Sequence, residues 1–320
     1  MAMELTPEII KRLELLQEKF NAMGQDMLSY LDGLLYADYL TYWDYIHVDT
    51  LLSLQNPKTP IPDEEVFIMY HQITELYFKL CLHELRQISG KEPIEAAFLK
   101  ARLRRVNRYF ENLTRSFDIM VDGMEHEQFL KFRMSLLPAS GFQSAQYRTI
   151  ELYSTQFIEL VAKEQKEEYR SRPEASVREM YEHIYWKQGA TELSSGSKTL
   201  TLRQFELKYS EDIIRTAEAI KGRTLWDKYL SLPEADRNDA SLKEELKQLD
   251  LNVNVNWPLV HYKSAARYLQ KDPDDIKATG GTNWQKYLPP RFQRRIFYPA
   301  LWGPEDLEDW GKGLKKLFEA

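Results

Sequence analysis

The chain has 320 residues, enough for one large domain or two ordinary ones, and 43% of them are hydrophobic, enough for a sizeable core. The net charge is −6 and no basic arm or stripe is present, which argues against nucleic-acid binding because that function needs clustered Lys and Arg. The one cysteine, Cys81, excludes an intramolecular disulfide, and its apolar helical surroundings predict a buried structural thiol.

Helix-forming residues dominate the chain, and its compartment is predicted from the lack of a recognisable signal peptide or long apolar run. Gly and Pro are scarce, with 13 and 14 residues, and alternating runs of Val, Ile and Thr are few. The sequence therefore predicts an all-α protein. No segment resembles a signal peptide and no apolar run reaches about 18 residues, so we expect a cytoplasmic protein without a membrane span.

The predicted helices follow one another along the whole chain. The first opens at Thr6, where an N-cap precedes proline, and runs to about Leu31 before Gly33. An aromatic-rich segment over 36–54 and a proline-rich turn over 56–62 follow. Further helices are predicted over about 63–88, over about 94–121, from near Gln143, and through the charged region 160–250 with breaks at Pro173, Gly189, Gly196 and Pro233. We expect a single helical domain over residues 1–320, a multi-helix bundle.

His261 is the histidine with the most informative neighbours. None of the six histidines has metal-cluster spacing, and no nucleophile elbow, phosphate-binding loop or dinucleotide fingerprint occurs. One helical face would carry His261 with Trp257, Val260, Ser264, Ala265 and Tyr268. A histidine on an apolar face is usually a satisfied core residue. Here the small side chains one turn on would leave room for a flat macrocycle, and a neutral imidazole is a common proximal ligand of haem iron.

Arg133 is a second unusual residue, because the predicted helical face places it beside apolar side chains. Residues 129, 132, 133 and 136 share that face, so the guanidinium lies among two phenylalanines and a leucine. A charge in such surroundings needs an anionic partner, either an internal Glu or Asp or the carboxylate of a substrate. The loop 278–283 holds paired glycines with hydroxyl side chains, which suits either a mobile lid or an ordinary turn.

Taken together, these segments resemble the tryptophan 2,3-dioxygenase family, in matching order and spacing from about 41 to 288. The most specific stretch is Pro-Ala-Ser-Gly-Phe-Gln-Ser at 138–144. The other matching stretches are Thr-Tyr-Trp-Asp-Tyr-Ile-His-Val-Asp at 41–49 with 51–55, Asp-Glu-Glu-Val-Phe-Ile at 63–68 with 71–79, Phe-Arg at 132–133, Gln-Tyr-Arg at 146–148, His261 with Arg267, and Thr-Gly-Gly at 279–281 with 287–288. Residues 160–250 show no likeness, and we interpret them as a variable helical insertion.

The resemblance implies an α-helical homotetramer that binds b-type haem through one histidine. The implied reaction inserts both atoms of O2 across the indole C2–C3 bond of L-tryptophan or a close analogue and gives N-formylkynurenine. His261 falls on the axial histidine, Arg133 on the arginine that binds the substrate carboxylate, and Thr279 on the threonine of a closing loop. The remaining substrate-binding candidates are Phe67, Phe129 and Ser140 in the matching stretches and, where a neighbouring subunit completes the pocket, Tyr42, Tyr45 and Ile46.

Several positions depart from the family pattern. Pro62 fills the slot in which the family usually has a histidine, so no catalytic base is assigned, and Phe129 stands where a tyrosine is usual. The loop between Gln55 and Pro62 is short and lacks the family's phenylalanine, and Asn283-Trp284 replaces part of the usual Ser-Ser-Gly. Three alternatives therefore remain: a related mono-oxygenase that hydroxylates a substituted indole or other aromatic amino acid, a haem-binding sensor without turnover, and a purely structural helical scaffold.

Overall fold

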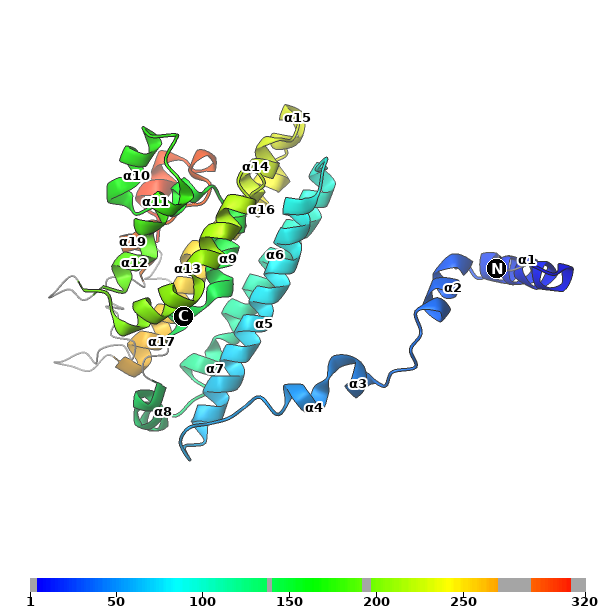
Figure 1. The fold of residues 1–320 in the computed structure, drawn as a ribbon, viewed down its shortest axis with the longest axis horizontal. Helices are drawn as coiled ribbons and strands as arrows, with labels where there is room; N and C mark the ends of the chain where they lie inside the picture. The colour runs from blue at the N-terminus through cyan, green and yellow to red at the C-terminus, as the bar shows by residue number, and fades with distance from the viewer. Residues whose placement is uncertain (1–4, 137–139, 192–196, 270–288, 312–320) are drawn as a thin grey trace. The chain divides into compact units, whose positions relative to one another are not determined.

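The described residues of the computed structural model are 5–136, 140–191, 197–269 and 289–311, and they form helices joined by turns (Figure 1). Within these ranges no strand occurs, and two isolated β-bridges join Val161 to Ile184 and Thr191 to Lys198. The all-α class predicted from composition is confirmed.

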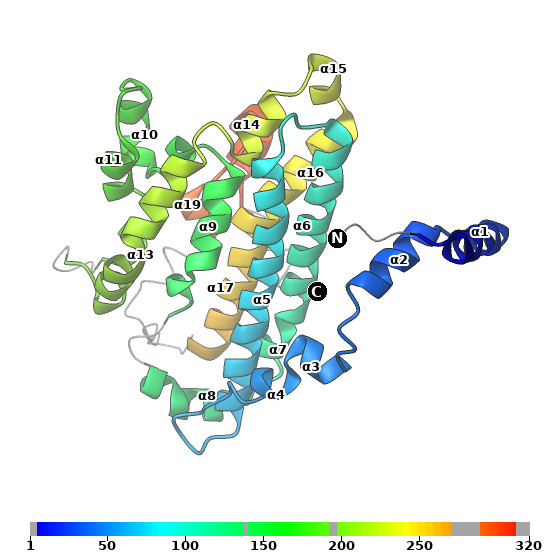
Figure 2. The ribbon, with the colours of Figure 1, turned by 45° about the vertical axis from the view of Figure 1, so that its right-hand side comes forward.

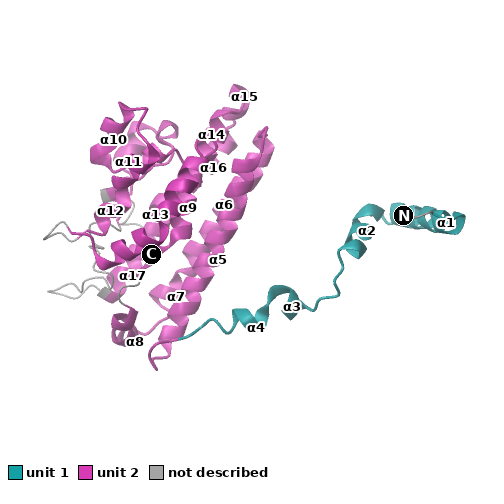
Figure 3. Cartoon of the chain, viewed as in Figure 1, with its two compact units in different colours: residues 1–56 teal, residues 57–320 magenta. Residues whose placement is uncertain are grey.

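The chain divides into two compact units, residues 1–56 and 57–320 (Figure 3). The first unit holds α1 (Pro7–Ala22), α2 (Met27–Leu35), α3 (Tyr42–Ile46) and α4 (Val48–Leu51). The predicted single helix from Thr6 to Leu31 is wrong. Gly24 takes a left-handed conformation with φ of +63° that ends α1, and the Asp26 carboxylate accepts hydrogen bonds from two backbone amides to begin α2. The single-domain organisation stays a prediction.

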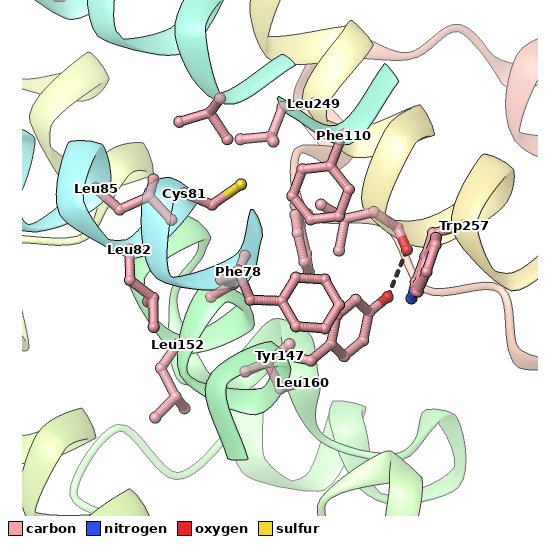
Figure 4. Packing of buried hydrophobic residues seen from close by; sticks show 14 of the residues in the cluster. Phe78, Cys81, Leu82, Leu85, Phe110, Tyr147, Leu152, Leu160, Leu249 and Trp257 are labelled. Atoms are coloured by element: carbon pink, nitrogen blue, oxygen red, sulfur yellow. Dashed lines mark hydrogen bonds between the residues drawn. The ribbon is translucent and has the colours of Figure 1, made fainter. Parts of the chain in front are cut away.

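Two long helices form the frame of the second unit: α5 (Asp63–Gly90) and α6 (Ala96–Ser116), which pack side by side (Figure 2). Their bounds agree with the predicted helices to within a few residues, except that a turn at Phe117 separates α6 from the short α7 (Asp118–Val121). Both helices bury one apolar stripe, since their side chains at three- and four-residue spacing face the same core. Cys81 lies in this core with 1% of its surface exposed, so the predicted buried thiol is confirmed (Figure 4).

The rest of the second unit covers this frame with shorter helices. Their bounds are α8 (His126–Phe132), η1 (Arg133–Leu136), η2 (Gly141–Gln143), α9 (Ala145–Ser154), η3 (Phe157–Leu160), α10 (Lys163–Arg170), α11 (Val177–Glu182), α12 (Tyr185–Gly189), α13 (Leu200–Ala219), α14 (Leu225–Leu230), α15 (Glu234–Arg237), α16 (Ala240–Leu251), η4 (Asn252–Asn256), α17 (Trp257–Leu269), α19 (Pro290–Gln293), η5 (Pro299–Leu301) and α20 (Pro304–Glu308).

Helices from the middle of the chain contact the frame from two sides. α9 packs on α5, α13 packs on α9, and α16 packs on α6. Two predicted breaks are helix boundaries, since Gly189 ends α12 and Pro233 precedes α15. A third, Pro173, lies between α10 and α11, and Gly196 falls outside the described residues. No described helix is long and apolar enough to cross a membrane.

A wider helical turn joins α16 to α17. Residues 252–256 form a π-helix, and the side chain of Asn252 accepts hydrogen bonds from Gln248 and Asn256. The wider turn changes the angular phase of the residues that follow. Trp257 is consequently buried against Phe78 of α5, with ring centroids 5.8 Å apart, and it begins the helix that carries His261 (Figure 4).

Candidate functional site

His261 lies one turn into α17, and two aromatic rings pack against it. Its imidazole meets Phe117 edge-on with ring centroids 4.8 Å apart, and the Trp257 ring lies 4.9 Å away. Burial and, to a smaller extent, the nearby His71 together lower the pKa of His261 to about 4. The imidazole is therefore neutral near pH 7, which is the form that can give a lone pair to a metal ion.

The ring nitrogens of His261 make no hydrogen bond to any described residue. The residue is partly rather than fully buried, as are Ser264 and Ala265 one turn further along the same face. A neutral imidazole whose nitrogens bond to no described residue, with small side chains beside it, could hold the iron of a planar group such as haem. The other ring nitrogen of such a ligand usually donates to a carbonyl or a water that fixes the ring, and no described carbonyl accepts from His261.

His71 of α5 is the site residue that sequence analysis did not single out. Its Nδ1 lies 2.7 Å from the backbone carbonyl oxygen of Phe67, and the two rings are 4.1 Å apart. Burial lowers the pKa of His71, so the ring is neutral and Nδ1 carries the proton that it donates. Nε2 is then an acceptor. The spacing of Phe67, His71 and Thr74 on one face of α5 was the available signal.

An aromatic wall continues from His71 towards α8 and back to α17. Phe67 contacts Phe132 at 5.7 Å and Phe129 at 6.3 Å between ring centroids, and Phe129 contacts Tyr268 at 4.7 Å. Edge-on and tilted geometries at these distances are the favoured ones for aromatic pairs. We call these five residues together with His261 the histidine–aromatic cluster: His71, Phe67, Phe129, Phe132 and Tyr268. The structure thus brings the predicted residues Phe67, Phe129 and His261 into one neighbourhood.

Arg133 follows Phe132 directly and is buried, with 6% of its surface exposed. Burial lowers the pKa of its guanidinium, but an arginine retains its charge throughout the physiological range. The predicted uniform helical face is only partly correct, because α8 ends at Phe132 and Arg133 begins the 3₁₀-helix η1.

Asp63 ties α8 to the beginning of α5. Its carboxylate Oδ2 accepts the backbone N–H of Glu125 at 2.6 Å, and its own N–H donates to the Gln128 side chain at 3.1 Å. These reciprocal bonds satisfy amide groups at the N-termini of two helices at once. They fix the end of α8, and hence Phe129, against α5.

Glu64 holds the loop that leads into α5. Its two carboxylate oxygens accept the backbone N–H groups of Lys58 and Thr59, each at 2.7 Å. Burial opposes ionisation, but the hydrogen bonds from Thr59 and Lys58 outweigh it and lower the pKa of Glu64. The loop therefore delivers Pro62 to the start of α5, where Pro62 makes no side-chain capping bond.

The other predicted site residues lie elsewhere or outside the described ranges. Ser140 precedes η2, where its hydroxyl oxygen accepts the N–H of Phe142 and its own N–H donates to the Gln143 side chain. Thr279 lies outside the described residues. The aromatic candidates of the first unit are exposed on α3, with 73% of Tyr42, 73% of Tyr45 and 39% of Ile46 accessible.

The side chains of the matching stretch 146–148 have a structural role. The amide Nε2 of Gln146 donates to the Glu75 carbonyl at 2.8 Å, which joins α9 to α5. The Arg148 side chain donates to Glu151 and to the Tyr185 hydroxyl at 3.1 Å and 2.7 Å, and Arg295 pairs with the same Glu151. This buried ion network holds the later chain segment onto α9.

Comparisons with known proteins show which family this chain is similar to. A family profile described as tryptophan 2,3-dioxygenase matches residues 32–213, which is more than half of the chain. A tryptophan 2,3-dioxygenase from Ruegeria sp. (strain TM1040) is 42% identical over 119 residues, covering 36% of this chain and 42% of that protein. The protein of that name from Bacillus thuringiensis subsp. konkukian (strain 97-27) is 28% identical over 274 residues, covering 83% and 92%.

A third such protein, from Polaromonas sp. (strain JS666 / ATCC BAA-500), is 28% identical over 273 residues, covering 82% of this chain and 86% of that protein. The stronger local match to the Ruegeria protein spans less than half of that relative's length. The weaker matches extend over most of both chains. Sequence identity to these relatives is therefore higher over one part of the chain than over the rest.

Proposed function

Because the chain belongs to the tryptophan 2,3-dioxygenase family, we propose that it is a haem-dependent enzyme that opens the indole ring of L-tryptophan or a close analogue. The product is N-formylkynurenine, with both atoms of O2 inserted across the C2–C3 bond. The observation that carries this proposal is the desolvated, neutral imidazole of His261 beside an aromatic wall. The relatives' shared name supports the choice of tryptophan.

In this proposal His261 would hold the iron of a b-type haem. When bound, the haem iron supplies the activation of dioxygen, which amino-acid side chains cannot provide. The burial that holds His261 neutral keeps its lone pair free for the metal near pH 7. Phe117 and Trp257 restrict rotation of the ring by packing against it on two sides.

In the same proposal the charge of Arg133 and the rings of the histidine–aromatic cluster orient the substrate. The Arg133 guanidinium binds the amino-acid carboxylate through two parallel hydrogen bonds, a geometry that arginine is built to provide. Phe129 and Phe67 pack against the planar side chain. Ser140 and Thr279 complete the polar contacts to the amino and carboxylate groups.

Pro62 affects substrate binding because its side chain offers neither a hydrogen-bond acceptor nor a base. Pro62 has no side-chain acceptor for the indole N–H and cannot remove its proton. The substrate is therefore held by its carboxylate and by its aromatic surface rather than by a bond to the indole nitrogen. This arrangement tolerates an electron-rich aromatic ring other than unsubstituted indole.

The exposed aromatic face of α3 supports an oligomeric enzyme. Tyr42, Tyr45 and Ile46 leave large apolar surfaces accessible, and exposed clusters of this kind commonly mark protein contacts. In the proposed homotetramer these residues complete the site of a neighbouring subunit. Light scattering of the purified protein measures the assembly, and a monomer that retains full activity would refute this part. A cytoplasmic location stays a prediction.

The reaction is tested with the reduced, haem-loaded protein. Incubation with L-tryptophan and isotopically labelled O2 should give N-formylkynurenine that carries two labelled atoms. One labelled atom in a hydroxylated product would instead identify a mono-oxygenase. Haem binding without any product and without a Soret shift on adding aromatic amino acids would identify a sensor.

The ligand assignment has its own test. We expect His261→Ala to abolish stable haem binding, and His261→Gly to regain haem when imidazole is added. His83→Ala is the matched control, because His83 is exposed on α5. Retention of normally ligated haem by His261→Ala would place the ligand at another residue.

A further inference from the structure

A cavity of about 520 Å³ lies among the helices of the middle region and shares no residue with the histidine–aromatic cluster. It is bounded by η3, by α10 and α11, and by the turn that leads from α13 into α14. Cavities of this size are in the range that holds small organic molecules. The site lies within residues 152–227, and the family profile covers this stretch as far as residue 213, so the expectation that residues 160–250 show no family likeness is wrong up to that point.

The floor of this cavity is apolar. Five of its lining residues are buried hydrophobic side chains contributed by four different parts of the chain: Leu152, Ala175, Val177, Ala217 and Ile220. Tyr169 adds an aromatic wall, and its hydroxyl is already committed to the Glu179 carbonyl at 3.1 Å. An apolar group that enters would gain dispersion contacts and leave water without displacing a hydrogen bond of the floor.

The charged side chains at the rim are mostly compensated. Arg170 pairs with Glu159 and Glu167, and Arg172 is surrounded by three glutamates of α10, α11 and the turn between them. Asp227 is also occupied: its Oδ2 accepts the amide and hydroxyl of Thr224, and its Oδ1 accepts the Gln156 side chain at 2.7 Å.

Lys221 is the exception at this rim. Its ammonium group is exposed and makes no ion pair or hydrogen bond to any described residue. It follows Ile220 of the floor directly, so the cation stands where the apolar lining meets solvent. The described rim thus offers one free positive charge and no free carboxylate.

We propose that this cavity is a binding site for a small apolar carboxylate. The hydrocarbon or aryl body occupies the floor of Leu152, Ala217 and Ile220, and the carboxylate pairs with Lys221. Since Asp227 is already satisfied, a zwitterionic amino acid finds no partner for its ammonium group. The site therefore prefers acids without an amino group, and it does not depend on the proposed reaction.

The test uses the full-length haem-loaded protein and 3-phenylpropionate as the probe. Calorimetric titration should show binding that leaves the Soret band unchanged, with weaker binding of the neutral amide 3-phenylpropionamide and of L-phenylalanine. Lys221→Glu should weaken 3-phenylpropionate by at least about threefold, in keeping with a partly exposed ion pair. Lys208→Glu is the matched control, because Lys208 is exposed on α13, the helix that leads into the turn of Lys221, but does not line the cavity.

A second variant tests the floor. Ala217→Leu adds apolar volume inside the cavity and should weaken the acid and its amide alike, whereas Lys221→Glu should affect only the acid. Unfolding midpoints verify that each variant is folded. Equal binding of acid and amide, or binding that shifts the Soret band and is indifferent to Lys221, would overturn the proposal.

Discussion

The haem-free protein should lose stability as the pH falls from about 6.5 to about 4, because His261 resists protonation in the folded state. An unfolded histidine has a pKa of about 6.5, whereas burial and the neighbouring His71 lower the pKa of His261 to about 4. Between these values the unfolded chain binds a proton that the folded chain does not. Stability therefore rises with pH across this window and is constant above it.

The size of the effect follows from the same two values. A difference of roughly 2.5 pKa units corresponds to about 3 kcal/mol, an upper figure because the imidazole is only partly shielded from solvent. By about pH 5 some 2 kcal/mol of this should be lost. His71 contributes in the same direction, since burial also lowers its pKa.

Urea unfolding of the haem-free protein at neutral pH and at about pH 5 measures this loss. His261→Leu should flatten the dependence, because the substituted side chain does not titrate, while His83→Gln, altered at an exposed position of α5, should behave as the parent does. If the parent and His261→Leu lost the same free energy between the two pH values, the assignment of a desolvated imidazole would be wrong.

Three further substitutions probe the contacts around the site. Arg133→Ala should weaken substrate binding by roughly 2–5 kcal/mol, measured by titrating the haem spectrum with tryptophan; unchanged affinity would mean an internal partner for Arg133. Asp63→Asn should cost about 1–2 kcal/mol of unfolding free energy and speed hydrogen exchange of the Glu125 amide, and an unaltered exchange rate would contradict the 2.6 Å contact. Glu84→Gln should lower stability by roughly 1–3 kcal/mol, since the buried side chain loses charge-assisted bonds to Arg102 and a second arginine of α6 while these partly exposed arginines regain water, and a midpoint within error of the parent would contradict that.

Features that depend on short-range patterns follow from the sequence alone. The period of apolar residues over 63–88 predicts α5 to within two residues, because one face of a long interior helix is buried along its whole length. The same reasoning places His261 on the apolar face of α17. Cys81 is buried because it lies on the same stripe.

Features that depend on backbone conformation were not predictable in the same way. Gly24 divides the first predicted helix through a single left-handed residue, although glycine also occurs inside helices, as Gly33 does in α2. The π-helical turn over 252–256 has no distinctive apolar pattern in the sequence, yet it determines which side chains of α17 face the core. No pattern in the sequence indicates the change to 3₁₀ geometry at Arg133 either.

Contacts between distant residues were the main gap in the candidate site. His71 stands in a stretch that resembles the family, but its place beside His261 depends on two helices that are separated by most of the chain. In the sequence, Asp63 is fully explained as a favourable charge at the N-terminus of α5, so nothing there indicates a further contact of its side chain. Its bond to Glu125 appears only when α8 is folded against α5.

Because hydrogen bonds of Asp63 and Glu64 fix the start of α5, a substitution at position 62 directly tests how the substrate is held. Pro62 is exposed at the start of α5 with φ of −57° and ψ of −41°, a conformation open to any residue, and Glu64 holds the preceding loop independently of it. Pro62→His should therefore fold normally and restore an acceptor for the indole N–H, tightening tryptophan by about 1 kcal/mol. Tryptophan methylated at the indole nitrogen should gain nothing, because it has no N–H to donate. An equal gain for both compounds, or no gain for tryptophan, would show that the indole nitrogen does not face this end of α5.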